Sequence, residues 1–232
     1  HASPDGDTIG SGFGLCAILR KMGKKANVYC SDELPKRYDF MYEGYEPQDF
    51  EVKTVVAVDV ADPKLLGKNL EHYADKVELC IDHHISNTGY AKRTLVEPHA
   101  AAACQVIFKL LSTQKLTECD TMIAKCLYTG IATDTGCFKF DSCTSETHAA
   151  AAELMKFDIG AGKINRRMFD QKSRARIAVE QHVLGSMEYY FDERCSVASV
   201  SLDDIKRTGL PAEEFEGIAG ITTVLETIEV GV

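Results

Sequence analysis

Acidic and imidazole side chains recur at four places in this sequence. His1-x-x-x-Asp5-x-Asp7 opens the chain, Asp59 ends an apolar run, Asp82-His83-His84 ends another, and Asp134 lies within Thr133-Asp-Thr-Gly. Carboxylates brought close together raise one another's pKa unless a cation binds between them. An oxygen and imidazole set without thiolate favours Mn²⁺, Fe²⁺ or Co²⁺ over Ca²⁺, with Mg²⁺ less well suited. Two such ions can activate a water and stabilise both the attacking and the leaving oxygen of a phosphoryl displacement.

Each of these signals has a structural alternative when it is taken alone. Asp-Gly near the start is ordinary turn chemistry, Asp59 could cap a helix after Pro63, and Asp82 could cap a turn. Two adjacent imidazoles after a buried strand have few structural uses, however, and four such elements in order are unexpected by chance. We therefore predict one metal centre. Gly10-Ser11-Gly12 adds a predicted helix start, where free backbone amides favour a phosphate.

The elements around these residues predict an α/β fold, with an open parallel sheet and helices on both faces. Three short apolar runs rich in β-branched residues are predicted as buried strands, namely residues 26–30, 54–59 and 77–82. Helices are predicted over residues 8–22, 63–73, 100–112, 119–132 and 144–157. Ligands of such sheets bind beyond the carboxyl ends of the strands. Asp59 and Asp82-His83-His84 are therefore expected to meet at one edge, joined by the loops that carry Asp5, Asp7 and Asp134.

The pattern changes near residue 160, where two glycines suggest a helix end and a domain edge. We predict a first domain over residues 1–160 and a linker helix over residues 161–192. Residues 193–232 hold a strand or two and a short helix, too few for an independent core. They are predicted to be part of a smaller α/β domain.

Composition and charge exclude several classes of protein. The net charge of −9 argues against a large nucleic-acid interface, which needs a basic face. No apolar run is long enough to cross a membrane, so no membrane partner is expected. The nine cysteines include no Cys-x-x-Cys pair, which argues against a zinc ribbon and favours reduced thiols. We expect a cytoplasmic protein.

The four motifs together resemble those of the DHH phosphoesterase superfamily. His1-Ala-Ser-Pro-Asp-Gly-Asp-Thr-Ile-Gly-Ser is close to the first motif, and Val58-Asp-Val-Ala-Asp and Asp82-His-His-Ile-Ser-Asn are similar to the second and third. Gly130-Ile-Ala-Thr-Asp-Thr-Gly-Cys-Phe-Lys-Phe resembles the fourth, as found in the subgroup of bacterial nanoRNases that also act on 3′-phosphoadenosine 5′-phosphate. The resemblance is strong over residues 1–160 and weaker beyond them.

Carried over position by position, the resemblance implies two Mn²⁺ ions per active site, with Mg²⁺ or Co²⁺ as substitutes. His1, Asp5 and Asp59 would hold one ion. Asp7, Asp59, His83 and Asp134 would hold the other, so that Asp59 bridges them. The resemblance also implies catalytic or substrate-binding roles for the remaining motif residues: His84 on the substrate phosphate or leaving oxygen, Asp82 supporting a histidine, and Asn87, Gly10 and Ser11 near the substrate.

The implied reaction is hydrolysis of a short oligonucleotide or dinucleotide to nucleoside 5′-monophosphates, and possible hydrolysis of 3′-phosphoadenosine 5′-phosphate. A homodimer is possible. The family's Gly-Gly-Gly-His segment and a strand before the first motif are not within these residues, so poor metal binding is expected of this stretch alone. An exopolyphosphatase or inorganic pyrophosphatase is one alternative, and a degenerate nucleotide-binding regulatory protein is another. Phe138 and Phe140 are predicted to pack in the core, with base stacking by one of them as the alternative.

Overall fold

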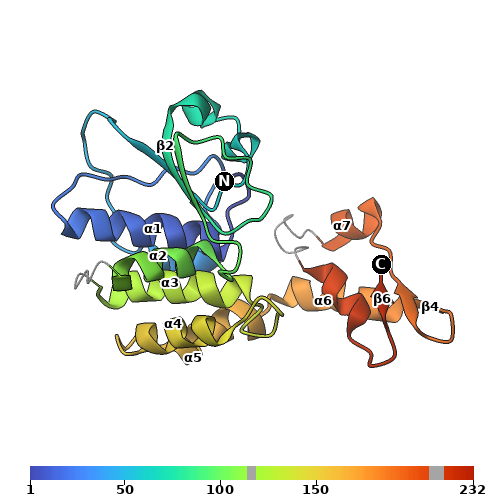
Figure 1. The fold of residues 1–232 in the computed structure, drawn as a ribbon. Coiled ribbons are helices and arrows are strands. Elements are labelled where there is room, and N and C mark those ends of the chain that lie inside the picture. Colours follow the sequence, from blue (N-terminus) through green and yellow to red (C-terminus); the bar gives the residue numbers. More distant parts are fainter. Residues whose placement is uncertain (114–118, 209–216) are drawn as a thin grey trace. The chain divides into compact units, whose positions relative to one another are not determined.

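The computed structural model describes residues 1–113, 119–208 and 217–232, which divide into two compact units, residues 1–170 and 171–232. The first unit contains a parallel sheet in the order β1-β2-β3, formed by β1 (Val55–Val58), β2 (Val77–Asp82) and β3 (Arg93–Val96) (Figure 1). No helix in the described part of the chain is both long and apolar enough to span a bilayer. The predicted α/β class, with a parallel sheet flanked by helices, is confirmed.

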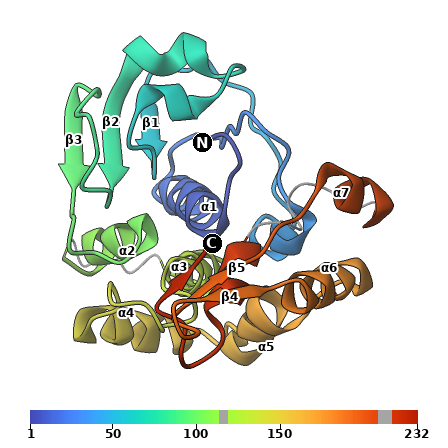
Figure 2. The same ribbon diagram turned by 90° about the vertical axis from the view of Figure 1, so that its right-hand side faces the viewer.

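Helices of the first unit lie in layers below the sheet. They are α1 (Gly6–Lys21), α2 (Ala103–Thr113), α3 (Thr121–Asp134), α4 (Ser145–Met155) and α5 (Ala161–Asn165), the last continued by a π-helical turn over Arg166–Asp170. In Figure 2, α1 and α2 lie directly below the sheet, α3 lies below these two helices, and α4 and α5 lie below α3. Three of these helices begin at side-chain caps, since Asp5 accepts from the amide of Thr8, Asp120 from that of Ile123 and Thr144 from that of Thr147.

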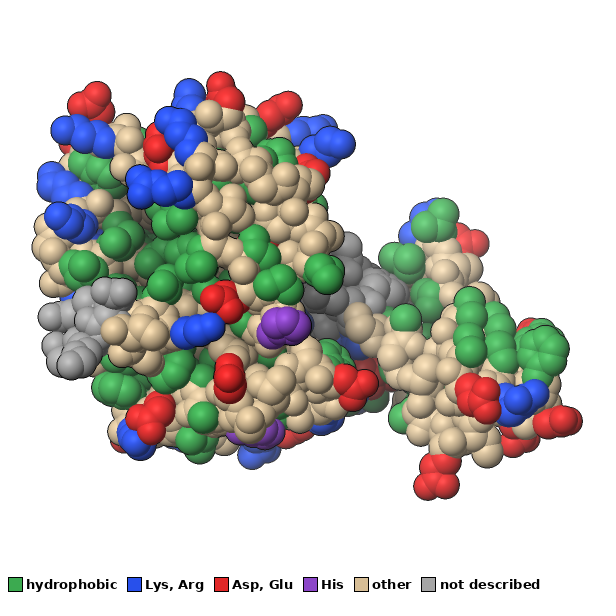
Figure 3. All heavy atoms as spheres, viewed as in Figure 1, with side chains coloured by type: hydrophobic (Ala, Val, Ile, Leu, Met, Phe, Trp, Pro, Cys, Tyr) green, Lys and Arg blue, Asp and Glu red, His purple; other side chains and the backbone are tan. Residues whose placement is uncertain are grey.

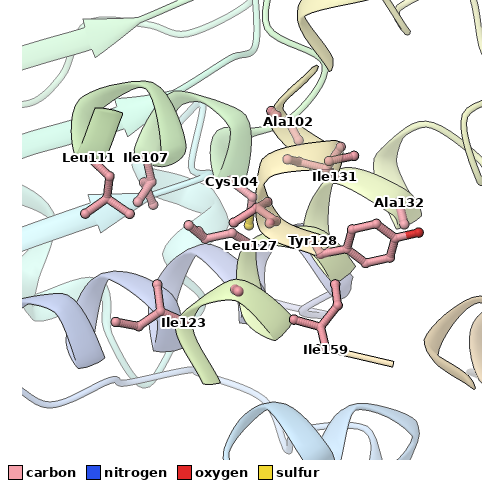
Figure 4. Packing of buried hydrophobic residues seen from close by; sticks show 14 of the residues in the cluster. Ala102, Cys104, Ile107, Leu111, Ile123, Leu127, Tyr128, Ile131, Ala132 and Ile159 are labelled. Carbon is pink, nitrogen blue, oxygen red and sulfur yellow. The ribbon is translucent and has the colours of Figure 1, made fainter. Parts of the chain in front are cut away.

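The alternation of strand side chains divides the core between the two faces of the sheet. Val56, Val58 and Ile81 face the α-helices and join the main cluster, which Figure 4 shows around Leu127 and Ile131. Ala57, Val77 and Cys80 face the other side, where the 3₁₀ helices η2 (Pro63–Leu66) and η3 (Glu71–Lys76) cover them. Successive strand residues point to opposite faces, so a sheet buried on both needs apolar residues at every position.

Two expected elements differ from the structure, and one observed strand was not expected. The helix predicted over residues 63–73 is interrupted at Gly67, whose φ of 78° lies in the left-handed region and ends η2. Residues 26–30 form no strand, because a cavity of about 630 Å³ lies between them and β1 and their amides at Ala26 and Val28 bond to side chains of Gln48 and Tyr45 instead. A strand without a neighbour has no ladder to join. The third strand was not predicted and lies at Arg93–Val96.

The second unit is smaller. It contains α6 (Arg174–Gly185), β4 (Glu188–Tyr190), β5 (Cys195–Val197), α7 (Leu202–Thr208), the 3₁₀ helix η6 (Ile218–Thr223) and β6 (Val230–Gly231). β5 pairs with β4 antiparallel and with β6 parallel, and Val179 and Val183 of α6 form the centre of its core. The linker helix expected over residues 161–192 is therefore replaced by α5, the π turn, α6 and β4. Ser173, which caps α6 through the amide of Arg176, starts a new helix inside that range.

Candidate metal centre

The ends of five elements meet at the carboxyl edge of the sheet. Asp59 directly follows β1, and Asp82 is the last residue of β2. Asp5 caps the start of α1, with its carboxylate on the amide of Thr8 at 2.9 Å. Asp134 is the last residue of α3. The fifth end is the start of α2, where the buried carboxylate of Asp7 accepts hydrogen bonds from the amides of Ala103 and Cys104.

The six predicted metal ligands are brought together. They form two groups whose potential ligand atoms lie within 4.8 Å of one another: His1, Asp5 and Asp59, and Asp7, His83 and Asp134. The groups adjoin, since His83 Nε2 lies 3.6 Å from Asp59 Oδ1, 3.9 Å from Asp7 Oδ2 and 3.2 Å from Asp134 Oδ2. On the other side, His1 Nε2 lies 3.8 Å from Asp59 Oδ2. Asp59 thus touches both groups, which makes this arrangement a possible metal-binding cluster.

Two buried atoms between the groups lack ordinary hydrogen-bond partners. Asp59 Oδ1 and His83 Nε2 are both buried and make no hydrogen bond to any group of the described residues. A buried carboxylate oxygen or imidazole nitrogen without a partner is costly. A divalent cation between these atoms would satisfy both, and carboxylate oxygens and imidazole nitrogens are common ligands of divalent metal ions. The residues present therefore fit a bound metal.

The electrostatics of the cluster agree with that fit. Burial, and then the charges of Asp59 and Asp134, raise the pKa of Asp7 well above its usual value. Burial and the charges of Asp5 and Asp59 likewise raise the pKa of Asp134, although its contact with His83 opposes this. Burial lowers the pKa of His83, but contacts with Asp134 and Asp59 outweigh it and raise the pKa to about 11. A cation bound between these side chains would relieve the repulsion that contributes to the raised pKa of Asp7 and of Asp134.

Asp82 is the anchor of the Asp82-His83-His84 triplet. It is fully buried, and its Oδ1 accepts from the amides of His83 and His84 at 2.8 and 3.3 Å and from His84 Nδ1 at 2.7 Å. Its Oδ2 accepts from Asn87 Nδ2 at 2.6 Å. Burial raises the pKa of Asp82, but the bonds from His84 and Asn87 prevail and hold it below its usual value. The side chain of His84 is 42% exposed, and its Nδ1 is the ring nitrogen that bonds to Asp82.

Gly10, Ser11 and Asn87, which were expected near the substrate, make hydrogen bonds within the protein, and their roles toward a substrate stay predictions. Helix α1 starts at Gly6, so Gly10 and Ser11 lie in its second turn, and their amides belong to the helix. Both are buried, and the Ser11 hydroxyl donates to the carbonyl of Thr8. The helix start predicted at Gly10-Ser11-Gly12 is therefore corrected by one turn, because Asp5 is the cap. Asn87 turns its amide group to Asp82 and to the carbonyl of Val60.

Two carboxylates of the candidate centre accept hydrogen bonds that were not predicted from the sequence. The Thr8 hydroxyl donates to Asp59 Oδ2 at 2.6 Å, and the amides of Ala103 and Cys104 donate to the two oxygens of Asp7 at 2.6 and 2.9 Å. The Thr8 contact could have been predicted, because Thr8 lies inside the first motif and its hydroxyl is a hydrogen-bond donor. The contact from the α2 amides could not, because every residue except proline has a backbone amide and these two lie almost 100 positions from Asp7.

Comparison with known proteins places the chain in a family. The model of the DHH family, N-terminal domain, matches residues 1–131. The bifunctional oligoribonuclease and PAP phosphatase NrnA of Thermus thermophilus is 32% identical over 198 residues, which are 82% of this chain and 58% of that protein. The protein of the same name from Bacillus subtilis is 24% identical over 225 residues, 95% of this chain and 71% of the relative.

A solved structure shares the fold. The structure of an exopolyphosphatase-related protein from Bacteroides fragilis superimposes with a TM-score of 0.89 at 23% identity, covering 98% of this chain and 72% of its own. At this identity the likeness concerns the fold alone. The family model, in contrast, covers more than half of the present sequence and includes the first three motifs. The chain belongs to the DHH family.

Proposed function

We propose that this chain carries the active site of a phosphoesterase that uses two Mn²⁺ ions to hydrolyse short oligonucleotides or dinucleotides in the cytoplasm. The products would be nucleoside 5′-monophosphates, and 3′-phosphoadenosine 5′-phosphate would be a second substrate. The observation that carries the proposal is the convergence of His1, Asp5 and Asp59 with Asp7, His83 and Asp134 around two partnerless buried atoms. The names of the two NrnA relatives support the choice of substrates.

The two groups of side chains define how the ions would be held. His1, Asp5 and Asp59 would bind one ion, and Asp7, Asp59, His83 and Asp134 the other, with Mg²⁺ or Co²⁺ as possible substitutes. When bound, two such ions would neutralise phosphate charge and lower the pKa of a water at the reacting phosphorus. Asp59 belongs to both sets of residues, and the Thr8 hydroxyl would hold the Asp59 carboxylate in its orientation.

His84 has the geometry of a substrate contact. Its Nδ1 is bonded to Asp82, which fixes the ring, and this bond is the main reason that the pKa of His84 is raised. A protonated His84 would donate from Nε2 to a phosphate oxygen and would supply the proton that the leaving oxygen needs. Asp82 itself would not touch the substrate, because both of its oxygens are occupied by His83, His84 and Asn87.

The charges around the cluster argue for a substrate that places a single phosphate group at the site, rather than a chain of phosphates. Within the described residues, the ion-pair contacts of Asp7, Asp59 and Asp134 are made with histidines and not with Lys or Arg. On the face in Figure 3, the basic side chains of the first unit are intermixed with acidic ones. A pyrophosphatase or exopolyphosphatase would need several cations beside the site. Those activities remain the alternative that the experiment must distinguish.

The experiment compares the 232-residue chain with Asp59→Asn, in the presence of Mn²⁺. The substrates are pApA, a longer RNA, 3′-phosphoadenosine 5′-phosphate, pyrophosphate and polyphosphate. Asp59→Asn should lower metal affinity, measured by calorimetry, and reduce turnover of pApA by about 1,000-fold or more, equivalent to several kcal/mol. Asp62→Asn is the matched control, because Asp62 lies in the same loop and caps η2.

Two results would count against the proposal. Retained turnover in Asp59→Asn would refute the bridging role. A wild-type preference for pyrophosphate or polyphosphate over pApA would replace the oligonucleotide substrate with the alternative class.

A further inference from the structure

The loop that follows Asp134 has an unusual backbone. Gly136, Cys137 and Phe138 have φ values of 54°, 61° and 63°, so three successive residues lie in the left-handed region. Residues other than glycine rarely adopt it, and such strain persists only where the surroundings enforce it. Here Thr135 enforces it, because its buried hydroxyl accepts from the amide of Phe138 at 3.0 Å. Backbone strain of this kind concentrates at ligand-binding sites.

This turn gives its two phenylalanines different surroundings. Phe138 is partly buried and has ring neighbours, with centroids 6.0 Å from Tyr128 and 5.3 Å from His148. Phe140 is 58% exposed and takes part in no ring pair among the described residues. The expectation that both rings pack in the core is therefore wrong for Phe140. The left-handed turn, unlike the expected alternation, sends its side chain out of the core.

The ring of Phe140 lies across the backbone of the metal-ligand loop. A Cβ built on Gly136 would lie 2.6 Å from two carbons of this ring, so the ring covers Gly136. The amide of Phe140 also bonds to the carbonyl of Thr135 at 3.1 Å, which holds residue 140 close to that position. Gly136 is two residues beyond Asp134, and two residues span at most roughly 7 Å. The ring of Phe140 therefore packs on the turn that directly follows the candidate ligand Asp134.

We propose that Phe140 is a base-stacking residue of this site and receives the nucleobase of the nucleotide whose phosphate lies at the Asp134 cluster. The inference rests on the proposed function and makes it more specific. It assigns nucleotide recognition to an aromatic face, which accepts any base because every base has a π surface. It also predicts that the first unit itself discriminates nucleotides from other phosphate esters.

The first test measures binding without turnover. Calorimetry on the 232-residue chain with Mn²⁺ compares AMP with ribose 5-phosphate, which has the same phosphate and sugar but no base. Wild type should bind AMP roughly 10- to 100-fold more tightly, the range that one stacked base provides. Phe140→Ala and Phe140→Leu should remove this preference, whereas Phe140→Trp should keep it. Phe140→Leu retains an apolar side chain and so isolates the contribution of the ring.

The second test measures KM and kcat on pApA and on a base-free dinucleotide of the same phosphodiester backbone. Phe140→Ala should raise KM for pApA roughly 10- to 100-fold and leave that for the base-free substrate unchanged. Met155→Ala is the control for loss of an exposed apolar side chain, since Met155 is 51% exposed at the far end of α4. Melting temperatures of all variants report folding.

The outcomes separate this inference from the proposed function. Equal binding of AMP and ribose 5-phosphate by wild type, or an unchanged preference in Phe140→Ala, overturns base stacking even if pApA is hydrolysed. Failure of wild type to hydrolyse pApA refutes the proposed function, and the binding comparison still decides whether Phe140 stacks a base.

Discussion

At the scale of single residues, the candidate centre depends on one carboxylate in a strained backbone conformation. Asp59 has a φ of 57°, a conformation that costs a residue with a Cβ roughly 1–2 kcal/mol. Its amide bonds to the carbonyl of Ile81 at 2.9 Å, which continues the β1–β2 pairing, and the Thr8 hydroxyl holds its Oδ2. The carboxylate lies between the two groups of candidate ligands, 3.8 Å from His1 Nε2 and 3.6 Å from His83 Nε2. Thr8 is therefore the contact that decides which way this carboxylate faces.

Replacing Thr8 by valine tests that contact with little change of shape. Thr8→Val should weaken Mn²⁺ binding by about 10- to 100-fold, as is usual for residues that orient a metal ligand. The free energy of unfolding should fall by about 1–3 kcal/mol, because a buried oxygen of Asp59 loses its donor. Thr8→Ser keeps the hydroxyl and should restore affinity. Calorimetric titration provides the measurement, and an unchanged dissociation constant in a folded Thr8→Val would exclude the orienting role.

At the scale of elements, the approach of α3 to Asp7 requires a residue without a side chain. A Cβ built on Gly130 would lie 2.3 Å from Cys104 Sγ and 2.7 Å from Asp7 Oδ1, closer than real contacts allow. Asp7 is fully buried and already held by the amides at the start of α2. The carboxylate thus lies between α2 and α3 with no free space, and Gly130 is what permits it.

Gly130→Ala should therefore disturb both stability and metal binding. Overpacking of this kind typically costs about 1–3 kcal/mol, and displacement of Asp7 should weaken Mn²⁺ affinity as well. Adding Cys104→Ala removes one of the two clashes, so the double variant should regain stability more than affinity. Gly162→Ala is the control, since a Cβ there meets nothing within 4 Å. Full affinity in a Gly130→Ala protein would contradict this account of Asp7.

At the scale of the whole chain, the chemistry and the main core belong to the same unit. All six candidate ligands and the three larger core clusters lie within residues 1–170, whereas residues 171–232 contribute a small core around Val179 and Val183. A domain with its own core can fold independently. The metal centre should therefore not depend on the second unit for its formation.

A fragment of residues 1–170 should accordingly unfold in one cooperative transition and bind Mn²⁺ with an affinity within about threefold of the 232-residue chain. Circular dichroism and calorimetry provide the measurements, and Asp59→Asn in the fragment is the negative control. Loss of binding in a folded fragment would show that residues beyond 170 complete the centre.

Predictions from the sequence were most successful where local patterns carry the information. The apolar runs before Asp59 and Asp82, and the helices around Cys104 and Leu127, are local features, and the structure contains these strands and helices. The expectation that strand-end residues meet at one edge follows from parallel-sheet geometry alone. The strand at Arg93–Val96 was missed because it is short and only partly buried.

The sequence by itself determined the α/β class, which follows from residue types and periodicity along the chain, and its resemblance to the DHH motifs pointed to the six candidate ligands. Only the tertiary structure decided how those residues are oriented and what surrounds them. The amides that hold Asp7, the lack of space beside Gly130 and the outward turn of Phe140 depend on contacts between elements distant in sequence or on a strained backbone. Neither effect has a local pattern, since backbone amides are alike in almost every residue type and the space beside a residue is set by elements distant in the sequence.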